Sequence, residues 1–385
     1  MNPVFASLPT TIFEDMSARA RANGAINLGQ GFPDADGPED VRQAAAEAVL
    51  TGWNQYPPMR GLPELRAAIA DHYDAHQGLS PDPDAEILVT SGATEALAAS
   101  ILGLVQPGDE AIIVQPAYDA YAPLVRQAGG IPRFVSTRPP DWKIRQEDLD
   151  AAVTKKTRFL VLNSPHNPTA TMLDADDLTL LADFCVAHDL IAICDEVWEH
   201  LVFDGAEHRS LITMPGMAER TVKIGSAGKI FSLTGWKVGW AMAPARLAPA
   251  IAKAHQFLTF TTPPNLQTAV AYGLGKDAAY FANMRTGYQA SRNRLSAALS
   301  DSGYAVLPSA ATYFLLVDLA GSGIEMGDRD FAMRLVEDFG VAAIPVSALY
   351  ETEAVNTVLR LCFAKDDQTL DTAAERLAEA RASLA

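Results

Sequence analysis

Cysteine is scarce in this sequence, and its spacing argues against two common stabilising devices. Cys185, Cys194 and Cys362 are the three cysteines in 385 residues, and no Cys-x-x-Cys pair occurs. An odd number of widely spaced cysteines fits neither a disulfide framework nor a structural zinc site. We therefore expect a protein of the reducing cytoplasm with no metal centre.

Positive charge and long apolar runs are also lacking. Thirty Lys and Arg stand against 47 Asp and Glu, for a formal net charge of −17. This balance argues against a surface that binds nucleic acid or an anionic membrane. The opening residues MNPVFASLPTTIFEDM have no secretory-signal pattern, and no apolar run reaches membrane-spanning length. An anionic ligand would therefore need a few specific donors in one local site.

The length and the hydrophobic pattern predict an α/β protein with two domains. A chain of 385 residues exceeds the usual size of a single core. From residue 86 onward, short apolar runs alternate with helical periods, which favours a mostly parallel sheet between two layers of helices. We expect an arm and loop over residues 1–40, a large three-layer domain over 41–291, and a smaller C-terminal α/β domain over 292–385.

One lysine lies in a setting suited to covalent chemistry. The stretch SAGKIFSLTGWKVGW surrounds Lys229 with small residues and glycines that leave room for a bulky group. A lysine amine condenses with aldehydes, and burial or neighbouring cations increase its nucleophilicity. Pyridoxal phosphate is the obvious aldehyde, because its ring serves as an electron sink for an amino acid Cα carbanion. Ser226 and Lys237 flank the lysine as expected phosphate ligands.

Two strand ends offer complementary groups for such a cofactor. In VTSGATEAL a strand turns into a helix at Gly92, Ala93 and Thr94, where free backbone N–H groups and the helix dipole form an anion site. In IAICDEVW an apolar strand delivers Asp195 to its carboxyl end, where a buried carboxylate needs a cationic partner. A protonated pyridine nitrogen is such a partner, and the carboxylate keeps the proton on it.

Together these motifs resemble those of the fold-type-I, class I/II pyridoxal-phosphate-dependent aminotransferases. The string GSAGKIFSLTGWKVGW is most similar to the kynurenine, glutamine and methionine aminotransferase branch. The resemblance covers nearly the whole chain, and its motifs occur in the order that the family has. It implies transfer of an amino group from a neutral, aromatic or sulfur-containing L-amino acid to a 2-oxo acid by a ping-pong mechanism.

The resemblance also assigns further residues to the site. It implies that Tyr118 stacks on the cofactor ring, that Asn167 contacts the 3′ oxygen of the cofactor and the substrate, and that Arg360 and the backbone N–H of Gly31 bind the substrate carboxylate. An arginine on a solvent-facing edge strand is the alternative for Arg360. The resemblance further implies that Tyr56 reaches the cofactor phosphate of a neighbouring subunit, which would make the active site the property of a homodimer.

Two positions depart from the family pattern. Trp198 stands where a tyrosine usually donates to the 3′ oxygen of the cofactor, and an indole N–H can donate but can neither accept nor ionise. Thr261 stands where the compared branch often has histidine, which weakens any preference for aromatic substrates.

Two other functions remain open at this level. A cysteine-S-conjugate β-lyase would use the same residues and would differ in what leaves after Cα deprotonation. A pyridoxal-phosphate-binding regulator would carry this fold behind a DNA-binding domain, which neither the opening sequence nor the negative charge favours. The preferred amino donor and oxo-acid acceptor cannot be read from the motifs.

Overall fold

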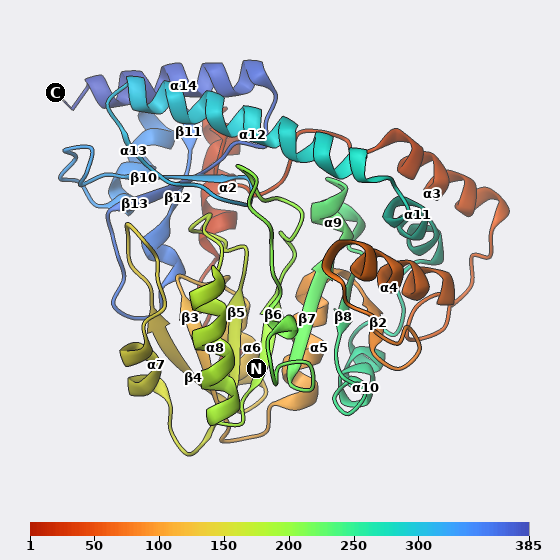
Figure 1. The fold of residues 1–385 in the computed structure, drawn as a ribbon. Coiled ribbons are helices and arrows are strands. Elements are labelled where there is room, and N and C mark those ends of the chain that lie inside the picture. Colours follow the sequence, from red (N-terminus) through yellow and green to blue (C-terminus); the bar gives the residue numbers. More distant parts are fainter. Residues whose placement is uncertain (385) are drawn as a thin grey trace.

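The computed structural model describes residues 1–384 and confirms the predicted α/β class (Figure 1). Seven strands form the large sheet in the order β2-β8-β7-β6-β5-β3-β4. Only β8 runs antiparallel to its neighbours, so the sheet is mostly parallel. The strands are β2 (Ile87–Thr90), β3 (Glu110–Gln115), β4 (Ile131–Ser136), β5 (Thr157–Asn163), β6 (Ile191–Asp195), β7 (Thr221–Ser226) and β8 (Gly239–Met242).

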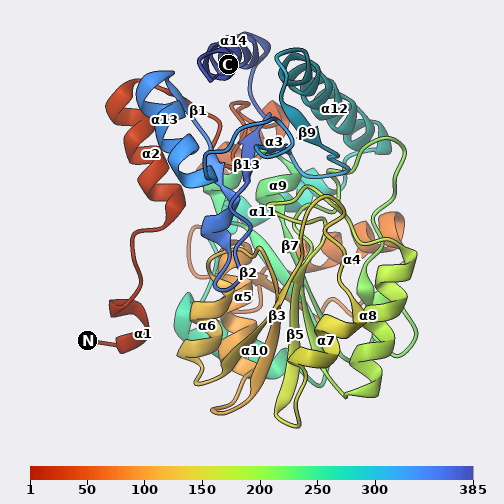
Figure 2. The same ribbon diagram turned by 90° about the vertical axis from the view of Figure 1, so that its left-hand side faces the viewer.

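Helices cover both faces of this sheet (Figure 2). One face carries α5 (Gly92–Leu104), α6 (Tyr121–Gln127) and α10 (Ala248–Leu258), and the other carries α3 (Glu39–Thr51), α4 (Pro63–Gln77), α7 (Gln146–Ala152), α8 (Ala175–Ala187) and α11 (Pro264–Leu274). Strand side chains alternate between the faces. In β3, for example, Ile113 packs with α5, whereas Ile112 packs into the core that contains α8.

The C-terminal part builds a second, four-stranded sheet in the order β12-β13-β10-β9. Its strands are β9 (Ala305–Leu307), β10 (Phe314–Asp318), β12 (Ile344–Pro345) and β13 (Val358–Cys362), and its helices are α12 (Ala278–Asp301), α13 (Asp328–Asp338) and α14 (Asp367–Ala382). All three helices pack against this sheet or against one another. The expected boundary at residue 292 falls inside α12, which runs unbroken from one unit into the other.

The N-terminal segment belongs with this C-terminal part. After α1 (Pro3–Ala6) and α2 (Ile12–Asn23), strand β1 (Ile26–Asn27) pairs in parallel with β11 (Val341–Ala342). Figure 2 shows α2 lying beside α13. The backbone N–H of Cys362 donates to the Leu28 carbonyl at 2.7 Å, and this bond seats the loop after β1 on the end of β13.

The carboxyl ends of the parallel strands meet at one edge of the large sheet, where motif residues lie. Register pairs Asn163 with Asp195, and Ser226 with Gly239 at the start of the antiparallel strand β8. The short helix α9 (Ala227–Ile230) and the 3₁₀ turn η2 (Thr234–Trp236) follow at this edge, and further 3₁₀ turns are η1 (Leu211–Thr213) and η3 (Val346–Leu349).

Helix α6 begins at Tyr121, because Tyr118 to Ala120 form a turn. Strand β8 shows no alternation of apolar and polar residues, whereas α11 has apolar residues at helical spacing, at Leu266, Ala269, Val270 and Leu274. Over residues 1–384, no helix combines the length and the apolar character needed to cross a membrane.

Candidate active site

A cavity of about 250 Å³ lies at the carboxyl edge of the large sheet. It brings together most of the residues that the sequence singled out, although they come from five separate segments. Its lining includes Gly92, Ala93, Thr94, Tyr118, Asn163, Asn167, Asp195, Trp198, Ser226, Lys229 and Lys237. A crevice outside the carboxyl ends of parallel strands is where ligands bind in sheets of this kind.

One end of the cavity is an anion cradle. It is formed by the first turn of the 13-residue helix α5, where Gly92 has φ +75°. A Cβ at Gly92 would lie 3.4 Å from Nζ of Lys237, so the ammonium sits close against the helix N-terminus. Within residues 1–384, no protein group hydrogen-bonds the side chains of Lys237 and Ser226. Free N–H groups, a hydroxyl and an unpaired ammonium are the donors that a phosphate needs.

Asp195 lies at the end of β6 and is 6% exposed. Tyr121 donates a 2.7 Å hydrogen bond to its Oδ2, and the Val197 backbone N–H lies 3.4 Å from its Oδ1. Burial raises the pKa of this carboxyl, while these two hydrogen bonds and the charge of Lys229 oppose the rise. The carboxylate is thus fixed in place and lacks a cation in direct contact, which suits a protonated ring nitrogen.

Lys229 extends from α9 into the cavity. Its Nζ lies 3.0 Å from the phenol oxygen of Tyr313 and 3.3 Å from the Gly31 carbonyl oxygen. Burial lowers the pKa of this amine to about 8, against the opposing effects of Cys362 and Asp195. About a tenth of the amine is therefore neutral and nucleophilic at pH 7, far more than for a lysine with an ordinary pKa.

Arg360 lies above Asn167 on β13, a central strand of the small sheet, and it is 1% exposed. The alternative of a solvent-facing edge arginine is therefore wrong. Its Nη1 donates to Oδ1 of Asn167 at 2.6 Å and its Nη2 to the Gly29 carbonyl at 2.7 Å, while its Nε has no partner. The guanidinium stacks 4.0 Å from the ring centre of Phe314, and burial lowers its pKa to about 10.

Trp198 forms part of the cavity wall and is 3% exposed. Its ring meets that of Tyr313 edge-on, with centroids 4.4 Å apart at 90°. Lys229 Nζ lies 4.5 Å from the indole centroid, within the range of a cation–π contact. The tryptophan thus contacts the lysine through its face and offers it no oxygen.

Tyr56 is the one predicted cofactor ligand that does not line the cavity. It is 80% exposed, and the centroid of its ring lies 5.3 Å from that of Phe260, which is 40% exposed. Leu50, Trp53 and Phe257 are exposed as well. Exposed large apolar side chains, such as the contacting pair Tyr56 and Phe260, are candidates for burial in a protein interface.

Two tyrosines that the sequence reading missed contact the central residues. Tyr121 bonds Asp195, and Tyr313 bonds Lys229. Tyr121 lies three residues after Tyr118 in the same QPAYDAY motif, and this motif is the local signal that could have indicated it. Tyr313 lies 84 residues from Lys229, and nothing local in the sequence links the two.

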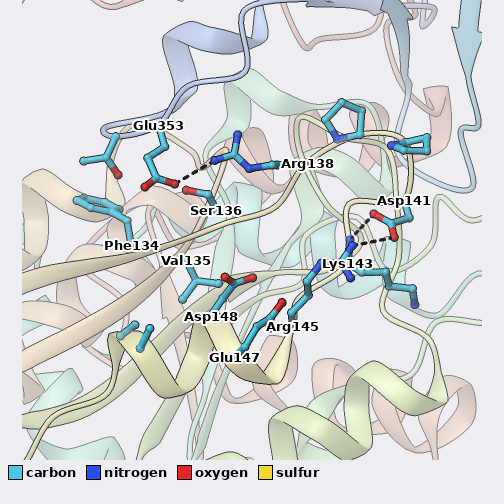
Figure 3. Close-up of a pocket in the computed structure, with 15 residues that line it drawn as sticks. Phe134, Val135, Ser136, Arg138, Asp141, Lys143, Arg145, Glu147, Asp148 and Glu353 are labelled. Carbon is cyan, nitrogen blue, oxygen red and sulfur yellow. Dashed lines mark hydrogen bonds and ion pairs between the residues drawn. The ribbon is translucent and has the colours of Figure 1, made fainter.

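A larger surface cavity, of about 540 Å³, lies between β4 and α7 (Figure 3). Its cations are already paired: Arg138 with Glu353, Arg145 with Asp141, and Lys143 with Asp174 and Asp177. Figure 3 shows the Arg138 guanidinium pointing at Glu353. The lining of this cavity has no unpaired cation for an anionic ligand, and its remaining charges, Glu147 and Asp148, are both acidic, so this cavity is the weaker candidate despite its size.

Comparisons with known proteins show which family and which solved structures this chain resembles. The family model for aminotransferase class I and II matches residues 23–377. The crystal structure of N-succinyldiaminopimelate aminotransferase from Mycobacterium tuberculosis superimposes with a TM-score of 0.96 at 45% identity, covering 99% of this chain and 100% of that one. Methionine aminotransferase of Escherichia coli is 42% identical over 370 residues (96% of both chains), and kynurenine–oxoglutarate transaminase 1 of Rattus norvegicus is 36% identical over 385 residues (91% of both).

Proposed function

The chain belongs to the class I and II aminotransferases and is a pyridoxal-phosphate-dependent transaminase, and on that premise we propose how its own residues carry the reaction. The observation that supports the proposal is the gathering of Lys229, Asp195 and the α5 cradle in one cavity. When bound, pyridoxal phosphate supplies an aldehyde for an amine and a ring that withdraws electrons from Cα.

The donor set of the cavity fits each part of the cofactor. The α5 N-terminus, Ser226 and Lys237 would hold the phosphate, and Gly92 leaves room for it where a Cβ would approach Lys237. Asp195 would hold the proton on the ring nitrogen, the ring of Tyr118 would limit ring tilt, and Asn167 with the Trp198 indole would lie on the side of the 3′ oxygen. Lys229 would bind the aldehyde carbon.

The small sheet and the N-terminal loop would bind the amino acid. Two terminal nitrogens of Arg360 already donate in one plane, to Asn167 and to Gly29, which is the arrangement that a carboxylate accepts. The backbone of Gly31 lies beside Lys229 and would complete this carboxylate site. Once the amino group of the substrate has replaced Lys229 on the aldehyde carbon, the freed amine of Lys229 would remove the proton from Cα and deliver it to that same carbon.

We propose neutral, aromatic or sulfur-containing L-amino acids as donors. The cations that line the cavity are Lys229 and Lys237, and both already have a function, so none remains for a side-chain carboxylate. Asp119, beside Tyr118, adds negative charge near the substrate site; burial raises its pKa and the charge of Arg360 opposes the rise. The β-lyase alternative is not favoured, because the relatives are named for amino transfer.

We further propose a homodimer whose active sites are shared, in the cytosol. The exposed side chains of Leu50, Trp53, Tyr56 and Phe257 would be covered by a second copy, and Tyr56 would reach the partner's phosphate cradle. The three cysteines are buried and unpaired, which suits a reducing compartment.

Borohydride trapping tests the assignment of Lys229. The protein is loaded with pyridoxal phosphate, reduced and digested, and mass spectrometry should place the adduct on the peptide that contains Lys229. An adduct on another lysine would overturn the assignment.

A panel of amino donors against pyruvate and 2-oxoglutarate tests the substrate class. Parallel initial-velocity lines are expected, because the first product leaves before the second substrate binds. Release of pyruvate and ammonia without an acceptor would indicate the lyase instead.

A further inference from the structure

Tyr313 is held in place by the segment that carries Trp198. The Phe203 backbone N–H donates to the Ala310 carbonyl at 3.0 Å, and that of Thr312 donates to the Leu201 carbonyl at 2.8 Å. Thr312 has φ +66°, a conformation that few residues other than glycine adopt, so the chain turns sharply just before Tyr313. These contacts direct the tyrosine ring into the site between the two sheets.

The Tyr313 phenol closes a group of three polar partners. Its hydroxyl donates a short hydrogen bond to the Gly31 carbonyl oxygen. The phenol carries a single proton, so its oxygen accepts the hydrogen bond from Lys229 Nζ, 3.0 Å away. Lys229 also lies 3.3 Å from the same Gly31 oxygen. The lysine ammonium therefore has two oxygen acceptors, and each is fixed by the other.

Trp198 cannot take the place of this phenol. An indole has one N–H donor and no acceptor, so it gives a lysine ammonium only its ring face. It does buttress Tyr313, because the two rings pack edge to face. The tryptophan thus packs against the tyrosine ring, and Tyr313 provides the oxygen that accepts a hydrogen bond from Lys229.

The loop that carries Gly31 packs closely against the rings of Tyr313 and Phe314. A Cβ at Gly31 would lie 2.9 Å from Cζ of Phe314 and 3.6 Å from Cε2 of Tyr313. Any side chain at this position would push the loop away from the phenol. The close seating of the loop and the hydrogen bond to its carbonyl therefore depend on each other.

We propose that Tyr313 is a positioning residue for the aminotransferase reaction, which holds the free amine of Lys229 and the substrate loop at Gly31 in one hydrogen-bonded group. Whenever the amine is free, the phenol holds it near the position that it occupies during the reaction. The hydrogen bond from the same phenol to Gly31 links the amine to the substrate loop. The proposal rests on the role of Lys229 proposed above. No comparable contact links the lysine to another side-chain oxygen within residues 1–384.

The test measures the titration of Lys229 in the cofactor-free protein. Trinitrobenzenesulfonate reacts with neutral amines, and mass spectrometry of the Lys229 peptide gives the modification rate as a function of pH. In the unchanged protein the midpoint should lie near the pKa of about 8. Tyr313→Phe removes an acceptor from the ammonium, so the midpoint should fall by about one unit.

Two further variants, Tyr288→Phe and Gly31→Ala, distinguish the proposed effect from a general effect on folding. Tyr288 is a half-buried tyrosine whose ring lies 6.1 Å from that of Tyr313 and whose phenol bonds Ser232, so Tyr288→Phe should leave the midpoint in place. Gly31→Ala keeps the Tyr313 hydroxyl in the protein but displaces the Gly31 carbonyl, the second acceptor, so it should also lower the midpoint. An unchanged midpoint in Tyr313→Phe, or an equal fall in Tyr288→Phe, would overturn the proposal. Borohydride trapping at Lys229 is scored separately, so failure of the lysine assignment is distinguishable.

Discussion

Arg360 and Asn167 lie 193 residues apart in the chain, and the arginine Nη1 donates a 2.6 Å hydrogen bond to the asparagine Oδ1. This contact joins the small sheet to the edge of the large one, at the place where both substrate and cofactor are expected to bind. The site is therefore built across two structural units, and its parts can be tested one at a time.

Replacing Arg360 with lysine should weaken substrate binding selectively. A lysine keeps the charge but cannot present two nitrogens in one plane. The loss of one charge-assisted hydrogen bond predicts a KM for the amino donor that is about 10- to 100-fold higher, with a smaller change in kcat. Steady-state kinetics check this, with the surface change Arg334→Lys on α13 as the control. A kcat loss at constant KM would contradict the carboxylate assignment.

Tyr121→Phe should move the pH dependence of cofactor binding. Burial raises the pKa of Asp195, and the Tyr121 hydrogen bond opposes this by stabilising the carboxylate. Removing the phenol therefore raises the pKa further, so affinity for pyridoxal phosphate should begin to fall at a higher pH as the solution is acidified. Titrations of the dissociation constant against pH test this. Tyr304→Phe, which removes a buried phenol bonded to a backbone carbonyl far from the site, should leave the curve unchanged.

Trp198→Tyr should change how the bound cofactor titrates. A phenol can donate, accept and ionise, whereas the indole can only donate. The visible absorbance of the loaded enzyme, followed against pH, should therefore show a shifted midpoint in the variant. Superimposable curves would show that position 198 does not influence the chromophore. Trp142→Tyr, at a tryptophan outside the cavity lining, is the control.

Lys223→Met should destabilise the fold. Lys223 is fully buried on β7 and bonds both Glu196 and Glu199, the latter at 2.7 Å. Its loss would leave two buried carboxylates without the ammonium that they share, at a cost of about 3–5 kcal/mol in the free energy of unfolding. Arg21→Met is the control, since the exposed Arg21–Glu14 pair should contribute about 1 kcal/mol or less. Denaturant unfolding measures both.

The same network predicts the acid limit of stability. Burial would raise the pKa of Glu196, but Lys223 and then His208 outweigh it and lower that pKa from 4.5 to about 2. A lowered pKa means that the stabilisation is complete above about 4.5 and is lost as the pH falls toward 2. In Lys223→Met this loss should begin at a higher pH. An unfolding curve that is independent of the variant in this range would contradict the assignment.

Mixing two inactive variants tests the shared active site. Lys229→Ala removes the amine from its own site, while Tyr56→Ala would remove a phosphate ligand from the partner's site. Each mixed dimer would then contain one complete site, and random mixing should restore about a quarter of the activity. Absence of recovery after subunit exchange, shown by size and mass analysis, would place Tyr56 outside the partner's site.

The sequence predicts the part of the site that depends on local pattern. Lys229, Asp195 and Gly92 each follow an apolar strand, and strand ends in a parallel sheet converge on one edge. Tyr313 and Phe314 could not be predicted in this way, because they reach the lysine and Arg360 only after the small unit packs on the large one. Strand β8, with the sequence GWAM, carries little local signal because it is short and has none of the β-branched residues that mark the other buried strands.

The pairing of β1 with β11 has a consequence for synthesis of the chain. Residues 26–27 leave the ribosome more than 300 residues before their partners at 341–342. The large sheet, whose strands all lie between these two points, can therefore assemble first, while the N-terminal segment waits unpaired. The substrate loop next to β1 would pack onto the site only near the end of translation. A nascent chain should therefore form the pocket around Lys229 before it can bind an amino acid.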